Sequence, residues 1–102
     1  MVHQAASTQE FKDFVASGTV VVDFNATWCG PCKMIAPFFE ELSKKYSSLK
    51  FIKVDVDELE DVSSEAGVSA MPTFFVYKDG KAVDQLVGAS KEKLEAMVKK
   101  YA

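Results

Sequence analysis

Short apolar runs alternate with amphipathic stretches along the 102-residue chain. The run TVVVDF, residues 19–24, is almost continuously β-branched, which is typical of a strand buried on both faces. FIKVDV, residues 51–56, predicts a second strand. Residues 73–87 contain two more strand-like runs on either side of Asp79-Gly80, and Asp-Gly is a strong two-residue turn signal. The pattern therefore predicts two strands followed by a hairpin.

Four stretches carry apolar residues at the spacing of an amphipathic helix. The first begins at Ser7, which can form a capping box with Glu10. The second covers residues 31 to about 46, the third ends at Gly67, and the fourth follows the capping residue Ser90. Helices and strands thus alternate, with room for a short edge strand before the first helix. This order favours an α/β architecture, in which βαβ units build a central sheet and the hairpin adds antiparallel strands.

The composition fits an ordinary globular protein. A chain of 102 residues with 48% hydrophobic and 26% charged residues can bury one core, so we expect residues 1–102 to form a single domain. The net charge of −3 supplies no basic field, so nucleic acid is not an expected partner. No uncharged apolar run approaches the ~18 residues of a membrane helix, and the first residues lack a signal-peptide pattern. We therefore expect a reducing, cytoplasmic location, unless a precursor was trimmed.

The only two cysteines, Cys29 and Cys32, lie three positions apart in ATWCGPCKMIAP, beside the only tryptophan. A structural zinc site requires four ligands, and the only imidazole is His3, in a terminus expected to be mobile, so no metal is expected. Because His3 is the only histidine, a Cys–His nucleophile is not expected either. A structural disulfide is also a weak interpretation, because closing a four-residue loop contributes roughly 2 kcal/mol against ~4.7 for a long loop.

A redox couple fits the spacing better. Residues i and i+3 share one face of a helix, with Cα atoms about 5 to 6 Å apart, which is within disulfide range. Cys29 lies at the expected N-cap of the second helix, where free N–H groups and the helix dipole stabilise a thiolate. We therefore expect Cys29 to attack a substrate disulfide and Cys32, the less exposed of the two, to resolve the mixed disulfide. Pro31 suits the first helical turn, where its missing N–H costs no hydrogen bond.

Asp23 is the polar residue in the otherwise apolar run VVVDF. Burial there would raise its pKa and give a carboxyl able to exchange protons with Cys32. An Asp that faces the sheet edge, or that is held by structural hydrogen bonds, explains the same pattern equally well. The residues alone leave both interpretations open.

The motif WCGPCK, preceded by VDF and followed by MIAP, resembles the active site of the thioredoxin family. KVDVDE, VSAMPTFFVYKDGK and VGAS resemble the family in order and spacing, so the resemblance extends from about Phe11 to the end. It implies a thioredoxin fold, with a central mixed sheet of four to five strands flanked by about four helices. It also implies a protein-disulfide reductase without a bound cofactor. Its partners would be disulfide-containing client proteins and a thioredoxin reductase that draws electrons from NADPH.

The resemblance also assigns roles to residues. Cys29 is similar to the family's nucleophile, Cys32 to its resolving cysteine, Asp23 to its buried acid and Lys53 to the lysine beside that acid. The residues that match the surface receiving the substrate chain are Trp28, Gly30, Pro31, Met71, Pro72, Gly88 and Ala89. The match of Met71-Pro72 to the family's loop facing the cysteines predicts a cis peptide bond, although trans is the commoner form.

Two alternatives stand beside the reductase. An oxidase or isomerase domain of the same fold usually carries a histidine between its cysteines, where this chain has Gly30-Pro31. A binding module would use the surface around Trp28 and Pro72, with incidental thiols. Asn25 departs from the aromatic residue or serine that many relatives carry two positions after the acid, which puts redox poise and partner choice in doubt. No further cysteine is available for regulatory disulfides, and we expect a monomer.

Overall fold

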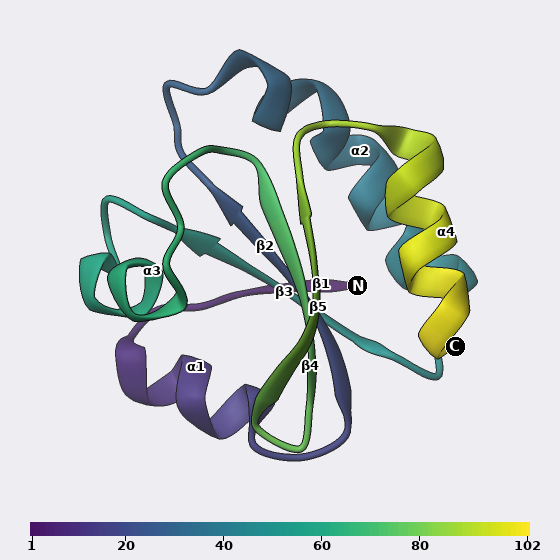
Figure 1. Cartoon of the computed structure of the whole chain (residues 1–102), viewed down its shortest axis with the longest axis horizontal. Helices are drawn as coiled ribbons and strands as arrows, with labels where there is room; N and C mark the ends of the chain where they lie inside the picture. Colours follow the sequence, from purple (N-terminus) through teal and green to yellow (C-terminus); the bar gives the residue numbers. More distant parts are fainter.

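The computed structural model of the chain describes residues 1–102 and contains five strands and four helices (Figure 1). In chain order they are β1 (Val2–Gln4), α1 (Thr8–Val15), β2 (Thr19–Asn25), α2 (Gly30–Lys45), β3 (Lys50–Asp55), α3 (Glu60–Ala66), β4 (Thr73–Lys78), β5 (Lys81–Val87) and α4 (Lys91–Tyr101). Every predicted helix and strand is present, and β1 is the short edge strand for which the pattern left room. None of the helices has the length and apolarity needed to cross a membrane.

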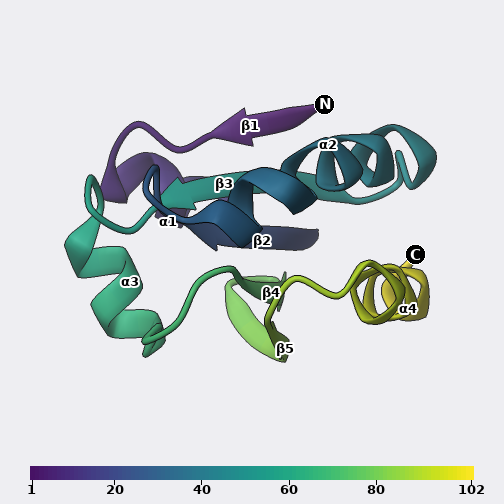
Figure 2. The ribbon, with the colours of Figure 1, turned by 90° about the horizontal axis from the view of Figure 1, so that it is seen from above.

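The five strands form one mixed sheet in the order β1-β3-β2-β4-β5. β1 and β2 pair with β3 in parallel, while β4 pairs antiparallel with both β2 and β5. α1 and α3 cover one face of this sheet, and α2 and α4 cover the other (Figures 1 and 2). β2 therefore lies at the centre of the sheet, and α2 begins just beyond its carboxyl end.

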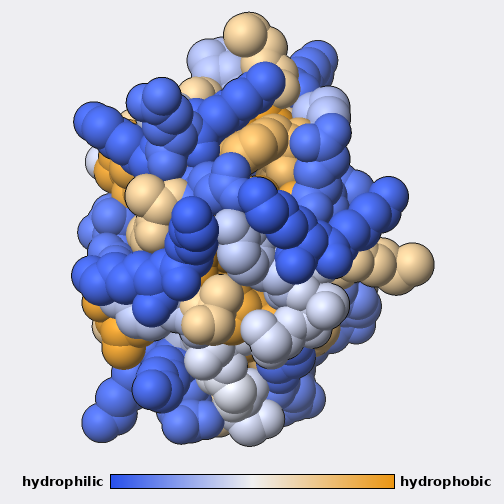
Figure 3. Space-filling view, turned by 90° about the vertical axis from the view of Figure 1, so that its right-hand side faces the viewer, coloured by the Kyte–Doolittle hydropathy of each residue, from blue (hydrophilic) through white to orange (hydrophobic).

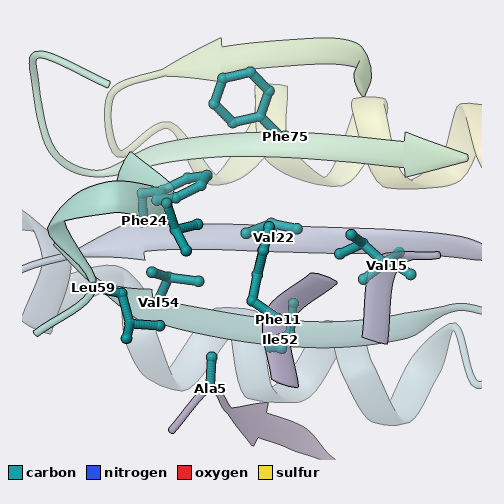
Figure 4. Close-up of a cluster of buried hydrophobic side chains, with 11 residues drawn as sticks. Ala5, Phe11, Val15, Val22, Phe24, Ile52, Val54, Leu59 and Phe75 are labelled. Atoms are coloured by element: carbon teal, nitrogen blue, oxygen red, sulfur yellow. The ribbon is translucent and has the colours of Figure 1, made fainter. Parts of the chain in front are cut away.

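The α1/α3 face of the sheet buries a cluster of eleven hydrophobic residues (Figure 4). The ring of Phe24 on β2 lies edge-on to Phe75 of β4, at 5.5 Å between centroids, and tilted toward Phe11 of α1, at 6.3 Å. Aromatic pairs in such arrangements contribute about 0.5–1.5 kcal/mol beyond the area that they bury. Val20 and Val22 of β2 belong to the same cluster. The alternate residues of β2 face the other helix pair, which explains why this strand is apolar almost throughout.

The α2/α4 face buries a second cluster of eleven residues. Phe39 of α2 packs edge-on against Phe51 of β3, at 5.4 Å between ring centroids, and tilted against Phe74 of β4, at 5.6 Å. Leu94 of α4 is fully buried in this cluster. Polar side chains cover most of the outer surface on this side of the molecule, and hydrophobic atoms show only in separate small areas (Figure 3). The apolar stripes of α2 and α4 are therefore buried in the core.

The helix starts follow the predicted capping residues, with one difference. Ser7 and Ser90 cap α1 and α4, and each accepts the N–H three residues further on, at 3.1 and 3.2 Å. Glu10 does not complete the capping box at Ser7, because its carboxylate accepts the N–H of Ala6 at 2.8 Å and lies 2.9 Å from His3 Nε2. The terminus that was expected to be mobile instead forms β1, and the His3–Glu10 contact joins β1 to α1.

Candidate active site

Cys29 and Cys32 lie where the loop after β2 meets α2, and they form a disulfide bond. Their Cα atoms are 5.3 Å apart, within the range predicted from the spacing. Cys29 is the N-cap of α2, and its Sγ accepts the N–H of Cys32 at 3.2 Å. Gly30 and Pro31 open the helix, and the missing N–H of Pro31 leaves nothing unpaired there. The predicted N-cap is thus confirmed, with the helix starting one residue earlier than predicted.

The two cysteines are equally exposed. Each keeps 5% of its accessible surface, and both belong to a small apolar cluster with Ala26, against which Val56 and Met71 pack. The expectation that Cys32 is the less exposed cysteine is therefore wrong for the disulfide state. The disulfide bond holds both side chains in the same small cluster.

Trp28, directly before Cys29, remains 67% exposed. Its indole N–H donates a hydrogen bond to Asp57 Oδ2 at 2.9 Å, in the loop after β3. Asp57 is held in turn by Asp55, whose Oδ1 accepts the N–H groups of Asp57 and Glu58 at 2.8 and 3.3 Å. Sequence reasoning missed both of these aspartates, for which the only signal is the acidic run DVDE at the end of a predicted strand.

The loop before β4 lies beside the disulfide. Its Met71-Pro72 peptide bond is cis, as the resemblance predicted, and Met71 packs against the cysteine cluster. The Pro72 carbonyl accepts the N–H of Gly88 at 2.9 Å, which links this loop to the segment after β5. Gly88 has a φ of 107°, a conformation that glycine adopts without strain. Among the residues matched to the substrate surface, Trp28, Gly30, Pro31 and Ala89 are exposed, Met71 and Gly88 are half-buried, and Pro72 is buried.

Asp23 lies within the central strand β2, with Lys53 of β3 and Phe74 of β4 as its neighbours in register. The residue is 3% exposed, and its Oδ1 has no hydrogen-bond partner. Burial raises the pKa of Asp23 to about 7, while the positive charge of Lys53 acts to lower it. Neither of the structural interpretations left open by the sequence fits, because Asp23 is not on an edge strand and Oδ1 is unpaired.

Asp23 and Cys32 line one pocket of about 150 Å³. The other lining residues are Asn25, Ala26, Thr27, Lys33, Ala36 and Lys53. The pocket places the carboxyl, the second cysteine and two lysines around one small space. Because both residues line this pocket, water within it could carry a proton from Cys32 to Asp23.

A larger pocket of about 490 Å³ lies on the opposite face of the sheet, between α1, α3 and β4. Phe11, Val62 and Tyr77 are among its lining residues, and neither cysteine is. Its size alone does not make it the redox site, because the reactive sulfurs lie elsewhere.

The structure contains no group of three or more His, Cys, Asp or Glu side chains that could hold a metal ion. The chemistry of the site is that of two sulfurs, a buried carboxyl and the N–H groups at the start of a helix. A disulfide between such sulfurs opens by exchange with a thiolate and forms again by the reverse attack.

Comparison with known proteins agrees with this chemistry. The Thioredoxin family model matches residues 2–100. The chain is 56% identical to thioredoxin-1 of Schizosaccharomyces pombe over 100 residues, 97% of each chain. It is 53% identical to Homo sapiens thioredoxin over 97 residues, 95% of this chain and 92% of the human protein. A solved structure of Plasmodium falciparum thioredoxin matches with a TM-score of 0.96 at 48% identity, over 98% of this chain and 99% of that one. The chain therefore belongs to the thioredoxin family.

Proposed function

We propose that this thiol-disulfide oxidoreductase reduces protein disulfides with Cys29 as the attacking thiolate and Cys32 as the resolving thiol. The observation that carries the assignment is the place of Cys29 at the N-cap of α2, where its Sγ accepts the N–H of Cys32. A helix N-terminus offers unpaired N–H groups and a positive dipole end, and both favour a thiolate over a thiol. Cys32 lies inside the first turn of α2, three residues after Cys29.

The reaction proceeds in two exchanges. The Cys29 thiolate attacks one sulfur of a client disulfide, forms a mixed disulfide and releases the other client sulfur as a thiolate. Cys32 then loses its proton and attacks Cys29 Sγ, which closes the intramolecular disulfide and releases the second client thiolate. The client gains two electrons from the cysteine pair. Each of its two thiolates takes up one proton. Cys29 and Cys32 have released one proton each, so the protons balance.

We assign Asp23 the role of proton acceptor for Cys32 during the second exchange. Both residues line the same pocket, and burial raises the pKa of Asp23 to about 7, so its carboxyl can take up and release a proton near neutral pH. Lys53, beside Asp23 in register, favours the ionised carboxylate and so keeps the acceptor available.

The proposed client surface surrounds the disulfide and consists of Trp28, Gly30, Pro31, Met71, Pro72, Gly88 and Ala89. Trp28 offers an exposed aromatic ring beside Cys29. Met71 lies next to the cysteines, where its backbone groups could pair with an extended client segment as an added strand does. Such pairing depends on the backbone groups of the client and not on its side chains, which suits a reductase that accepts many clients.

The oxidised pair must be reduced before the next cycle, and we propose that a thioredoxin reductase supplies the two electrons from NADPH. Membership of the thioredoxin family supports this partner. A reducing compartment such as the cytoplasm suits the cycle, because thiols are kept reduced there. The chain has no cysteine outside the pair that could form a disulfide dimer, and we propose that it acts as a monomer.

Single serine variants test the two cysteine roles. Cys29→Ser removes the attacking sulfur and is expected to abolish reduction of a disulfide-bonded peptide. Cys32→Ser should accumulate the mixed disulfide through Cys29, which mass spectrometry of the trapped complex detects. Trapping through Cys32 in Cys29→Ser, with none in Cys32→Ser, would reverse the assignment. Full biological function in the double Cys29→Ser, Cys32→Ser variant would favour a binding module instead.

A further inference from the structure

Asn25, the last residue of β2, lines the pocket that also contains Asp23 and Cys32. The pocket has a volume of about 150 Å³, which is room for several water molecules. Three of its lining residues, Thr27, Lys33 and Ala36, are exposed, so the pocket reaches the molecular surface. The pocket therefore gives water a route from solvent to the buried carboxyl.

Few groups face the Asp23 carboxyl. β3 contributes Lys53, directly opposite in register. Asp55, further along β3, is paired in register with Asn25 instead, and its Oδ1 accepts backbone N–H groups of its own loop. α2 contributes Lys33 as well as the second cysteine, and the neighbour on β4 is the apolar Phe74. Oδ1 of Asp23 has no hydrogen-bond partner from any of these elements. The partners of the ionised carboxylate must therefore come from the pocket itself.

Asn25 carries an uncharged polar side chain that lines this pocket. It lies two residues after Asp23 on the same face of β2. Its Nδ2 donates a long, 3.4 Å hydrogen bond to the backbone carbonyl oxygen of Asp23, which holds the amide beside that residue. The amide makes no other hydrogen bond within the chain and is half-buried, so one N–H and the carbonyl oxygen of Asn25 stay free for water.

We propose that Asn25 is a positioning residue whose amide holds the water linking the Asp23 carboxyl to solvent, and that it thereby sets the pH range in which Asp23 accepts a proton from Cys32. This inference rests on the proposed function of the cysteine pair. In the step concerned the Cys32 S–H bond breaks and an Asp23 O–H bond forms, leaving the thiolate that attacks Cys29. The Asp23 proton then passes to the pocket water and on to solvent. An apolar side chain at position 25 would leave the carboxylate with fewer partners and favour its protonated form.

Three variants of the full chain test the inference. Asn25→Leu replaces the amide with an apolar group of similar branching but larger volume, Asn25→Ser keeps a polar group, and Thr27→Val removes a hydroxyl elsewhere in the same pocket. The midpoint of Asp23 titration is read from the carbon-13 NMR shift of its carboxyl carbon in the oxidised protein without a client. We expect Asn25→Leu to raise the midpoint by about one pH unit, as loss of a hydrogen bond to a charged group predicts. Asn25→Ser and Thr27→Val should move it by less than about 0.3 unit.

The resolving step should follow the same shift. In stopped-flow Trp28 fluorescence, the pH at which Cys32 reaches half of its maximal resolving rate should rise in Asn25→Leu and stay in place in Thr27→Val. An unchanged NMR midpoint in Asn25→Leu, or an equal shift in Thr27→Val, would overturn the role of Asn25. Because the titration needs no client, that result alongside normal disulfide reduction would leave the proposed function intact. A wild-type chain that reduces no disulfide would refute the proposed function while the titration still reports on Asn25.

Discussion

The indole N–H of Trp28 and the carboxylate of Asp57 form a 2.9 Å hydrogen bond that joins the loop before α2 to the loop after β3. Trp28 is mostly exposed, so packing alone does little to fix its ring beside Cys29. Asp55 holds Asp57 in place, because its Oδ1 accepts the backbone N–H of Asp57. A chain of two hydrogen bonds thus orients the largest exposed side chain next to Cys29.

Replacing Asp57 with alanine should release the Trp28 ring. We expect the rate of disulfide reduction to fall by roughly two- to tenfold, since one hydrogen bond contributes about 0.5–1.5 kcal/mol. The indole N–H resonance of Trp28 should shift in NMR spectra, and this proton should exchange faster with solvent. Asp57→Asn keeps an acceptor oxygen and serves as the matched control. An indole resonance that stays in place in Asp57→Ala would show that the bond does not orient the ring.

The buried carboxyl of Asp23 should make stability depend on pH in an unusual direction. Its pKa is about 7 in the folded chain against 3.8 for an ordinary aspartate, so between these values the folded state holds a proton that the unfolded state has released. Stability should therefore fall as pH rises from about 4 to 7, and the full penalty of roughly 4 kcal/mol should apply above pH 7. Below pH 4 both states are protonated and no penalty remains.

Asp23→Asn isolates this effect, because the amide has nearly the same shape and does not ionise. Denaturant unfolding of the oxidised proteins should show the variant gaining stability over the wild type between pH 5 and pH 8. A stability difference that is the same at both pH values would mean that Asp23 titrates as an ordinary carboxyl.

Gly88 holds the segment after β5 against the loop before β4 through its N–H bond to the Pro72 carbonyl. At a φ of 107° an alanine would be strained, although no atom lies within 4 Å of the added Cβ. Gly88→Ala should therefore cost about 1–3 kcal/mol of unfolding free energy and weaken client reduction. Gly67→Ala is a matched control, because Gly67 also has positive φ, 76°, and open space, but ends α3 away from the cysteines. Equal loss of client reduction in the two variants would remove Gly88 from the client surface.

The elements that sequence reasoning placed well depend on local signals. The serine caps at Ser7 and Ser90 and the Asp79-Gly80 turn each act within a few residues, and the structure contains them all. β1 was harder, because three residues carry no readable period. It forms through pairing across the chain, with Val2 opposite Phe51.

The residues of the site likewise differ in whether a local signal in the sequence predicts them. The spacing of Cys29 and Cys32 was enough to predict a disulfide at a helix start, whereas Lys53 alone resembles any solvated lysine. Its place beside Asp23 comes from the register between β2 and β3, which are separated by a whole helix. Asp57 was missed for a similar reason, since its bond to Trp28 joins two loops that only the fold brings together.

A redox titration shows whether Cys29 and Cys32 form a reducing dithiol couple. Trp28 fluorescence would be followed while the protein is equilibrated through a graded series of thiol/disulfide buffers. We expect one reversible transition at about −270 mV, the general value for thioredoxin and not one derived from this chain. A midpoint between about −180 and −120 mV would instead indicate an isomerase or oxidase, and the absence of any reversible transition would show that the pair is not a redox couple.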